Sequence, residues 1–343
     1  MVPREYLRCP IIRYSPGEMI KMEDDVPSKA AGVEFGAVDL ALTGVMLVWG
    51  GNMIAVKLAL TEINPMAFNA LRFALASVTM LTILLITERD LKVTGREWRW
   101  LLMTGILGNT VYQVLFINGI NLSTAGNTAF MVATSPMWVA VMSSLWGDER
   151  LTRRQWKGVL LSLVGAALVI FGAGHRIAVS SGTLFGDALT LVGAICWAGY
   201  TVMTRPALAH RSPLRVTSYA MAFGSIPLVL VSIPHMRAQD WQSVSLTGWM
   251  MLLYGSLGAL VIGYLVWGWG VRVIGSTRTA IYNNLTPVVA GVFGYIILAE
   301  QWTLVRATGA VAILVGVYLV RSRGRSRRLQ SQSARESSQA DAI

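Results

Sequence analysis

The residue with the clearest potential for chemistry in this chain is Arg72, a cation inside the otherwise apolar stretch 66–86. Counted from Pro65 at 1.5 Å per helical residue, Arg72 lies about 10 Å along that stretch. If this stretch is a helix in an apolar medium, the guanidinium of Arg72 stays protonated and needs hydrogen-bonding partners or water. It could hold a carboxylate or phosphate of a solute through two parallel hydrogen bonds. In the alternative, structural interpretation, Arg72 caps helix carbonyls or pairs with Glu62.

Aromatic and amide side chains recur within similar apolar stretches. A cavity lined by rings and a few amides suits an amphipathic solute of amino-acid or metabolite size. Amides in an apolar medium need partners, so they should face the interior or a wet cavity, whereas rings near segment ends can be interface anchors. The set comprises Trp49, Asn52, Asn109, Tyr112, Gln113, Asn118, Trp138, Trp197, Tyr200, Tyr264, Trp267, Trp269, Tyr282, Asn283 and Asn284. From this set we expect the cavity to be lined by Trp49, Asn52, Tyr112, Trp197, Tyr200 and Asn284.

Enzyme chemistry has little support in the sequence. His175, His210 and His235 lie in or beside loops without metal-ligand spacing, and Cys9 and Cys196 form no CxxC pair. No GxSxG, HExxH or phosphate-binding P-loop motif occurs. We therefore expect no enzyme activity, no catalytic residue, no metal site and no cofactor, and a membrane enzyme or sensor is the weaker alternative.

The carboxylates lie at the ends of the apolar stretches or in loops, rather than at the membrane midplane where proton relays are usually found. Glu149 and Glu300 are interpreted as turn and cap groups beside the helices that follow them, since helix N-termini favour negative charge. Because no coupling residue is evident, an uncoupled facilitator or channel is an alternative to a coupled carrier.

These side chains must be positioned by membrane-spanning helices. The sequence is 54% hydrophobic and only 14% charged, with a mean hydropathy of +0.54. Stretches of about twenty apolar residues are long enough to cross a hydrocarbon core of roughly 30 Å. Ten are predicted, at approximately 39–60, 66–86, 98–118, 125–146, 155–173, 184–204, 214–233, 248–270, 277–298 and 303–321. We predict an all-α integral membrane protein with a polar leader (1–36) and a basic, polar tail (323–343), both disordered.

Most of the 29 Lys and Arg residues lie in the leader, in alternate loops and in the tail. The remaining loops contain only Arg176 and Arg237. Because cytoplasmic loops are enriched in Lys and Arg, this asymmetry predicts that both termini are cytoplasmic. The net charge of +11 is thereby explained by topology, and no nucleic-acid partner is expected.

The chain contains an internal repeat. Residues 119–172 match residues 270–323 without a gap at an offset of 151, and the match extends to the first segments at an offset of 148. Matched positions include Asp39 with Asp187, Trp49 with Trp197, Pro136 with Pro287, and Glu149 with Glu300. Each repeat, 37–174 and 183–322, holds five predicted helices. An odd number makes the second copy enter from the opposite side, which predicts a 5+5 inverted-topology repeat.

Several short motifs occur in order along the two copies. They are WGGN at 49–52, PMAFNALRFALA at 65–76, TSP at 134–136, GDERLT at 147–152, TPV at 286–288 and AEQWT at 299–303. Together they resemble the EamA-type family of the drug/metabolite transporter superfamily, over residues 37 to 322. The resemblance implies ten helices, cytoplasmic termini, an arginine at position 72, and transport of small organic solutes, often outward.

The resulting expectation is a secondary transporter in a bacterial-type inner membrane that exports a small metabolite by alternating access. Its expected partners are the solute and the lipid bilayer, and a homodimer is compatible with the sequence. Pro136 and Pro287 lie within matched helices, where proline removes a backbone hydrogen bond. We expect them to act as hinges of the two gates, with a static kink as the alternative.

Overall fold

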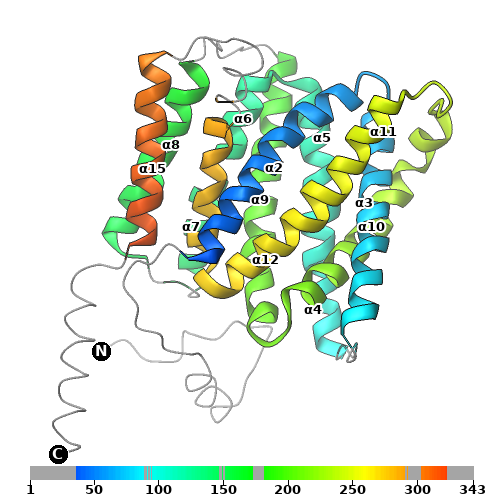
Figure 1. Ribbon diagram of the computed structural model, residues 1–343, viewed down its shortest axis with the longest axis horizontal. Coiled ribbons are helices and arrows are strands. Elements are labelled where there is room, and N and C mark those ends of the chain that lie inside the picture. The colour runs from blue at the N-terminus through cyan, green and yellow to red at the C-terminus, as the bar shows by residue number, and fades with distance from the viewer. Residues whose placement is uncertain are drawn as a thin grey trace, which may run out of the picture.

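The computed structural model describes residues 36–88, 91, 93, 95–146, 149, 151–172, 181–289, 292 and 303–322, and the elements found there are helices (Figure 1). Within this part of the chain, nine helices are long and apolar enough to cross a bilayer. They coincide with nine of the ten predicted segments. Most of the predicted leader, the predicted tail and Glu300 lie outside the described residues.

The first part of the chain forms α2 (Ala37–Ala59), α3 (Pro65–Thr87), α4 (Gly95–Gly105), the π-helix η2 (Ile106–Val111), α5 (Tyr112–Leu122), α6 (Ala125–Ala133), α7 (Ser135–Leu145) and α8 (Arg153–Phe171). The second part forms α9 (Ser181–His210), α10 (Pro213–Ala238), α11 (Leu246–Leu253), the π-helix η3 (Tyr254–Ile262), α12 (Gly263–Ile274), α13 (Ser276–Ala280), the 3-10 helix η4 (Ile281–Leu285) and α15 (Leu304–Arg321). The helices α2, α9 and α12 lie in the middle of the view in Figure 1.

Helix α8 begins where the local sequence provides a capping box. The Thr152 hydroxyl accepts a hydrogen bond from Gln155 N, and the Gln155 side chain accepts one from Thr152 N. The interpretation of Glu149 as a cap of this following helix is therefore wrong. Its carboxylate accepts a hydrogen bond from Thr277 N at 3.2 Å and pairs with Arg205 at 3.2 Å. Both partners are distant in sequence, so a local reading could not identify them.

The fourth predicted segment, 125–146, is divided into α6 and α7 at Thr134. Pro136 is at the start of α7, where a missing N–H is tolerated. The ninth predicted segment, 277–298, starts as α13 and tightens into η4, and residues 286–289 then return to helix around Pro287. Each proline thus lies just after an irregularity in its helix, which is the turn at Thr134 for Pro136 and the 3-10 helix η4 for Pro287.

Two π-helices interrupt long spans, one in each part of the chain. They end at Val111 and Ile262, positions separated by the repeat offset of 151. A π-helix accommodates extra residues in a turn and is frequent at functional sites. Thr110 in η2 donates a 2.6 Å hydrogen bond to the Gly224 carbonyl of α10, which ties the first π-helix to the second part.

The two parts also pack closely at glycines. A Cβ on Gly165 would lie 2.7 Å from the Gly309 carbonyl oxygen, and a Cβ on Gly158 would lie 2.8 Å from that of Gly316. The order of the contacts shows that α8 and α15 are antiparallel, since the earlier glycine of α8 meets the later glycine of α15. The two helices lie side by side at the left of Figure 1. The glycines therefore permit contact between helix backbones, as we expect where lipid supplies no hydrophobic drive for association.

Candidate functional site

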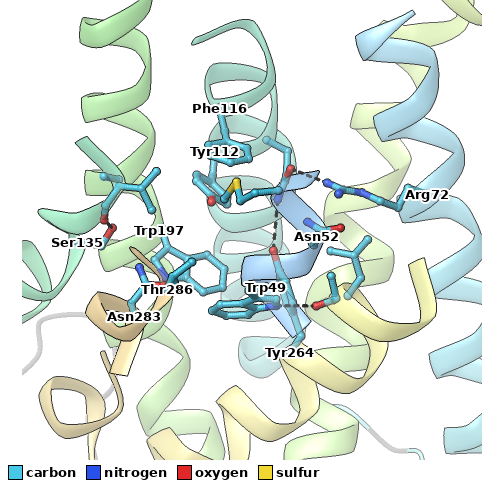
Figure 2. Close-up of a pocket in the computed structure, with 16 residues that line it drawn as sticks. Trp49, Asn52, Arg72, Tyr112, Phe116, Ser135, Trp197, Tyr264, Asn283 and Thr286 are labelled. Atoms are coloured by element: carbon cyan, nitrogen blue, oxygen red, sulfur yellow. Dashed lines mark hydrogen bonds between the residues drawn. The ribbon is translucent and has the colours of Figure 1, made fainter. Parts of the chain in front are cut away.

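A cavity of about 80 Å³ lies between the first and second parts of the chain, and Figure 2 shows the residues around it. Its walls come from α2, α3, α5, α6 and α7 of the first part and from α9, η3, α12 and η4 of the second. The lining residues are Trp49, Asn52, Met53, Arg72, Tyr112, Gln113, Phe116, Val132, Ser135, Ala194, Trp197, Ala259, Leu260, Tyr264, Asn283 and Thr286. Apolar rings and a few polar groups therefore share one small space.

Aromatic rings form a continuous wall of this cavity. The Trp197 ring lies 5.8 Å from that of Trp49, 5.3 Å from that of Tyr264 and 5.3 Å from that of Tyr112, between centroids. The Trp49 indole N–H donates a 2.9 Å hydrogen bond to the Ala259 carbonyl in η3. Trp49 thereby joins α2 to the second part, and its ring position is fixed by that bond.

Arg72 projects from α3 toward the cavity and is only 3% exposed. Its Nη2 group donates hydrogen bonds to Asn69 Oδ1 at 2.8 Å and to Gln113 Oε1 at 3.3 Å. The guanidinium also lies over the Phe68 and Phe73 rings, at 5.3 and 5.6 Å. Within the described residues its Nε has no hydrogen-bond partner. Neutral amides and rings thus surround a buried cation.

The alternative pairing of Arg72 with Glu62 is not present. The Glu62 carboxylate instead accepts hydrogen bonds from Ser245 N at 2.7 Å and from the Ser245 hydroxyl at 2.8 Å. Glu62 therefore joins the end of α2 to the start of α11, outside the cavity.

A short polar chain links the cation to the second part. Because the Gln113 amide oxygen accepts from Arg72, its amide nitrogen is the donor to the Tyr264 hydroxyl, at 3.4 Å. The Tyr264 oxygen thus acts as an acceptor there, which leaves its own proton available to a further acceptor. The arrangement offers N–H and O–H donors next to aromatic surface, a combination that suits an anionic, amphipathic solute.

Seven residues were expected from the sequence to bind the solute or line the cavity. Five of them do line it, namely Arg72, Trp49, Asn52, Tyr112 and Trp197. Two do not. Tyr200 stacks behind Trp197, with ring centroids 5.3 Å apart, and Asn284 points away to donate a 2.9 Å hydrogen bond to Ser162 in α8. The neighbouring Asn283 lines the cavity instead.

Other lining residues were not selected from the sequence. Gln113, Tyr264 and Asn283 belong to the aromatic and amide set, while Phe116, Ser135 and Thr286 lie outside it. The repeat contains a signal that could have found four of them. Gln113 with Tyr264 and Ser135 with Thr286 are each separated by 151 positions, and both pairs line the cavity. In the part of the chain described, no three His, Cys, Asp or Glu side chains gather as a metal-ligand set.

Comparisons with known proteins agree with this architecture. The model of the EamA-like transporter family matches residues 37–171 and again residues 184–322. An uncharacterized transporter of Archaeoglobus fulgidus is 31% identical over 284 residues, which cover 82% of this chain and 95% of the relative. The uncharacterized transporter YyaM of Bacillus subtilis is 26% identical over 279 residues, with coverage of 81% and 91%.

More distant similarity extends to plants and to a solved fold. A chloroplastic WAT1-related protein of Arabidopsis thaliana is 25% identical over 305 residues, covering 85% of this chain and 72% of the relative. A crystal structure superposes with a TM-score of 0.68 at 16% identity, over 83% of this chain and 96% of the other. The resemblance seen in the sequence motifs is confirmed by the family match to both parts of the chain. This chain belongs to the EamA-like transporter family and is a multi-pass membrane transporter.

Proposed function

We propose that this transporter exports small organic anions across the inner membrane by alternating access between two five-helix halves of inverted topology. The observation that carries the proposal is the buried Arg72 guanidinium in a cavity between the two parts. Among the described residues, none that lines this cavity is a carboxylate. Placing an unpaired cation in the apolar interior of a membrane is energetically unfavourable. The carboxylate or phosphate of a solute would supply the negative charge that pairs with Arg72.

The repeat supports a site shared by two halves. Trp49 and Trp197 are matched at an offset of 148, and Ser135 and Thr286 at 151. All four line the cavity. Inverted-repeat transporters bind their solute near the midplane between halves, so equivalent positions of both halves should meet there.

The volume of the cavity supports an alternating mechanism. Ligand pockets commonly enclose about 300–1,000 Å³, whereas this cavity encloses about 80 Å³. A metabolite would therefore enter only when the walls move apart on one side. In this scheme a change of conformation enlarges the cavity before the solute binds.

Transport into liposomes tests the proposal. Full-length protein would be reconstituted and supplied with labelled organic acids, including amino acids and phosphorylated metabolites, and with the neutral amides of the same carboxylic acids. We expect the acids to move at least roughly tenfold faster, because a charged hydrogen bond contributes about 1.5–3 kcal/mol. Equal rates for acids and amides would contradict an anion site. An imposed pH gradient separates a coupled carrier, whose rate changes, from an uncoupled facilitator.

The proposed orientation can be examined by cysteine labelling. Ser243 and Ala209 are exposed at opposite ends of the helices. In a variant in which Cys9 and Cys196 are replaced by serine, Ser243→Cys should react with an impermeant maleimide on intact cells. Ala209→Cys should react only after the membrane is opened. The reverse pattern would contradict cytoplasmic termini.

Pro136 and Pro287 are proposed as hinges because each lies beside a cavity residue, Ser135 and Thr286 respectively. Pro136→Ala and Pro287→Ala should each slow transport several-fold, since alanine supplies the N–H that a continuous helix needs and so favours one straight helix across the irregularity before each proline. The yield and thermal midpoint of the purified protein serve as the control. Parental rates at normal yield for both variants would leave static kinks as their role.

A further inference from the structure

Two carboxylates of the first part hold the segment α13–η4 of the second part. Glu149 accepts a hydrogen bond from Thr277 N at the start of α13, at 3.2 Å. Asp39 accepts a hydrogen bond from the Tyr282 hydroxyl in η4. We propose that Asp39 and Glu149 form a latch that keeps the cavity closed toward the end of the molecule where α2 begins and α15 ends.

The latched segment is itself a wall of the cavity. Asn283, the residue after Tyr282, lines the cavity, as does Thr286 just beyond η4. Figure 2 shows Asn283 and Thr286 next to Trp197 and Trp49. A displacement of α13–η4 would therefore move cavity residues directly, and the two carboxylates oppose that displacement.

Each latch carboxylate is also paired with an arginine of the second part. Asp39 receives hydrogen bonds from Arg321 Nε at 2.6 Å and from Arg321 Nη2 at 2.7 Å, and Glu149 pairs with Arg205 at 3.2 Å. Asp39 is only 4% exposed. The two bonds to Asp39 are charge-assisted and shielded from water, which places them among the stronger ones in proteins, and removing Arg321 would leave that buried charge uncompensated. The Arg205 side chain is 32% exposed, so its pair with Glu149 contributes less.

Two further ion pairs join the parts at the same end. Glu88 at the end of α3 pairs with Arg215 at 2.8 Å, and Glu97 in α4 pairs with Arg211 at 2.8 Å. As in the latch, the acid belongs to the first part and the arginine to the second. Asp39 is near the start of α2, Glu88 at the end of α3, and Arg321 at the end of α15, and these helix ends lie toward the bottom of Figure 1.

The repeat provides a comparison at the opposite end. Asp187 is the register partner of Asp39 at an offset of 148. Within the described part of the chain, it receives hydrogen bonds from the Ser123 hydroxyl and from Asn127 Nδ2, the latter at 2.7 Å. Matched acids thus meet a guanidinium at one end and neutral donors at the other. Neutral donors bind a carboxylate less strongly than a bidentate guanidinium does, so among the described contacts Asp39 is held more firmly than its matched residue Asp187.

The latch lies at the end that the Lys and Arg distribution assigns to the cytoplasm. In this proposal α13–η4 moves when a solute passes between the cavity and the cytoplasm, so the latch opens once in each transport cycle. This inference rests on the proposed alternating access. Its test below measures accessibility without any solute, so its outcome is distinguishable from a failure of transport.

A cysteine in the cavity reports whether the latch is closed. Ser135→Cys, in the full chain with Cys9→Ser and Cys196→Ser, would be labelled by an impermeant maleimide in inside-out membrane vesicles. Asp39→Asn with Glu149→Gln should increase the labelling rate from the cytoplasmic side by roughly tenfold, which corresponds to about 1.4 kcal/mol. The exchanged pair, Asp39→Arg with Arg321→Asp, restores opposite charges between α2 and α15, and the Tyr282 oxygen can then accept from the guanidinium instead of donating to a carboxylate. Its labelling rate should therefore be close to that of the parent.

The matched control is Asp187→Asn, which removes the equivalent carboxylate at the other end and should leave labelling from the cytoplasmic side unchanged. Gel filtration verifies that each variant is folded, and Glu149→Gln alone is measured if the double variant is not. A parental labelling rate in the folded latch variants would overturn the proposal. Equal acceleration by Asp187→Asn, or acceleration only in right-side-out vesicles, would overturn it as well.

Discussion

Arg72→Ala is expected to abolish transport of organic anions, with a fall in rate of at least roughly a hundredfold. The substitution removes the cation that lines the cavity between the two parts. It also leaves the Asn69 and Gln113 amide oxygens without the donor that they share. A buried charge–dipole or charge–charge hydrogen bond contributes about 1.5–3 kcal/mol, and two such bonds to one solute anion would account for the effect.

Arg72→Lys separates charge from geometry. Lysine retains the positive charge but loses the planar fork, so the affinity for anions should weaken roughly tenfold while folded yield stays normal. Arg154→Ala is the matched control, because Arg154 lies over Tyr318 on the surface of α8 and α15, outside the cavity. Unchanged affinity in Arg72→Lys, or loss of folded protein in both Arg72 variants, would assign Arg72 a structural role.

Gly165→Leu is expected to prevent stable packing of α8 against α15. Even a Cβ at this position would lie 2.7 Å from the Gly309 carbonyl oxygen, which is backbone and cannot rotate away. The two helices would have to separate, and overpacking of this kind costs about 1–3 kcal/mol or more. We expect the purified protein to show a strongly lowered thermal midpoint or to aggregate on gel filtration, and Gly309→Leu should behave in the same way.

Gly44→Leu supplies the control for this prediction. Gly44 lies in the helix α2, and a Cβ there would have no neighbour within 4 Å. The β-carbon of the new side chain therefore meets no neighbouring atom, in contrast to that at Gly165. Equal thermal midpoints for the Gly44 and Gly165 variants would show that the close contact between α8 and α15 contributes little to stability.

The positions of the spanning helices were largely determined by the sequence itself. Apolar length sets where a helix can cross the bilayer, and local caps such as Thr152 with Gln155 set where it begins. The duplicated motifs indicated the family, because they occur in the same order in both copies, at an offset of 148 in the first segments and 151 in the later ones. The ninth predicted segment differs, since it starts as α13 and η4 rather than as one regular helix.

The tertiary structure decided which polar and aromatic residues share the cavity. In a bilayer the outer face of a helix is as apolar as its packed face, so hydrophobic periodicity does not reveal which way a side chain points. Asn283 and Asn284 are adjacent in sequence, yet the first lines the cavity and the second bonds to Ser162. Likewise Tyr200 lies behind Trp197, although both occur on α9.

Long-range ion pairs were also decided by the fold alone. Glu149 looks locally like a cap of the helix that follows, but its partners are Arg205 and Thr277 of the second part. Arg321 reaches Asp39 across 282 positions. A charge interacts with whatever the packed helices bring within a few ångströms, so the sequence determined which charges the chain carries, and the packing of its two parts determined which of them meet.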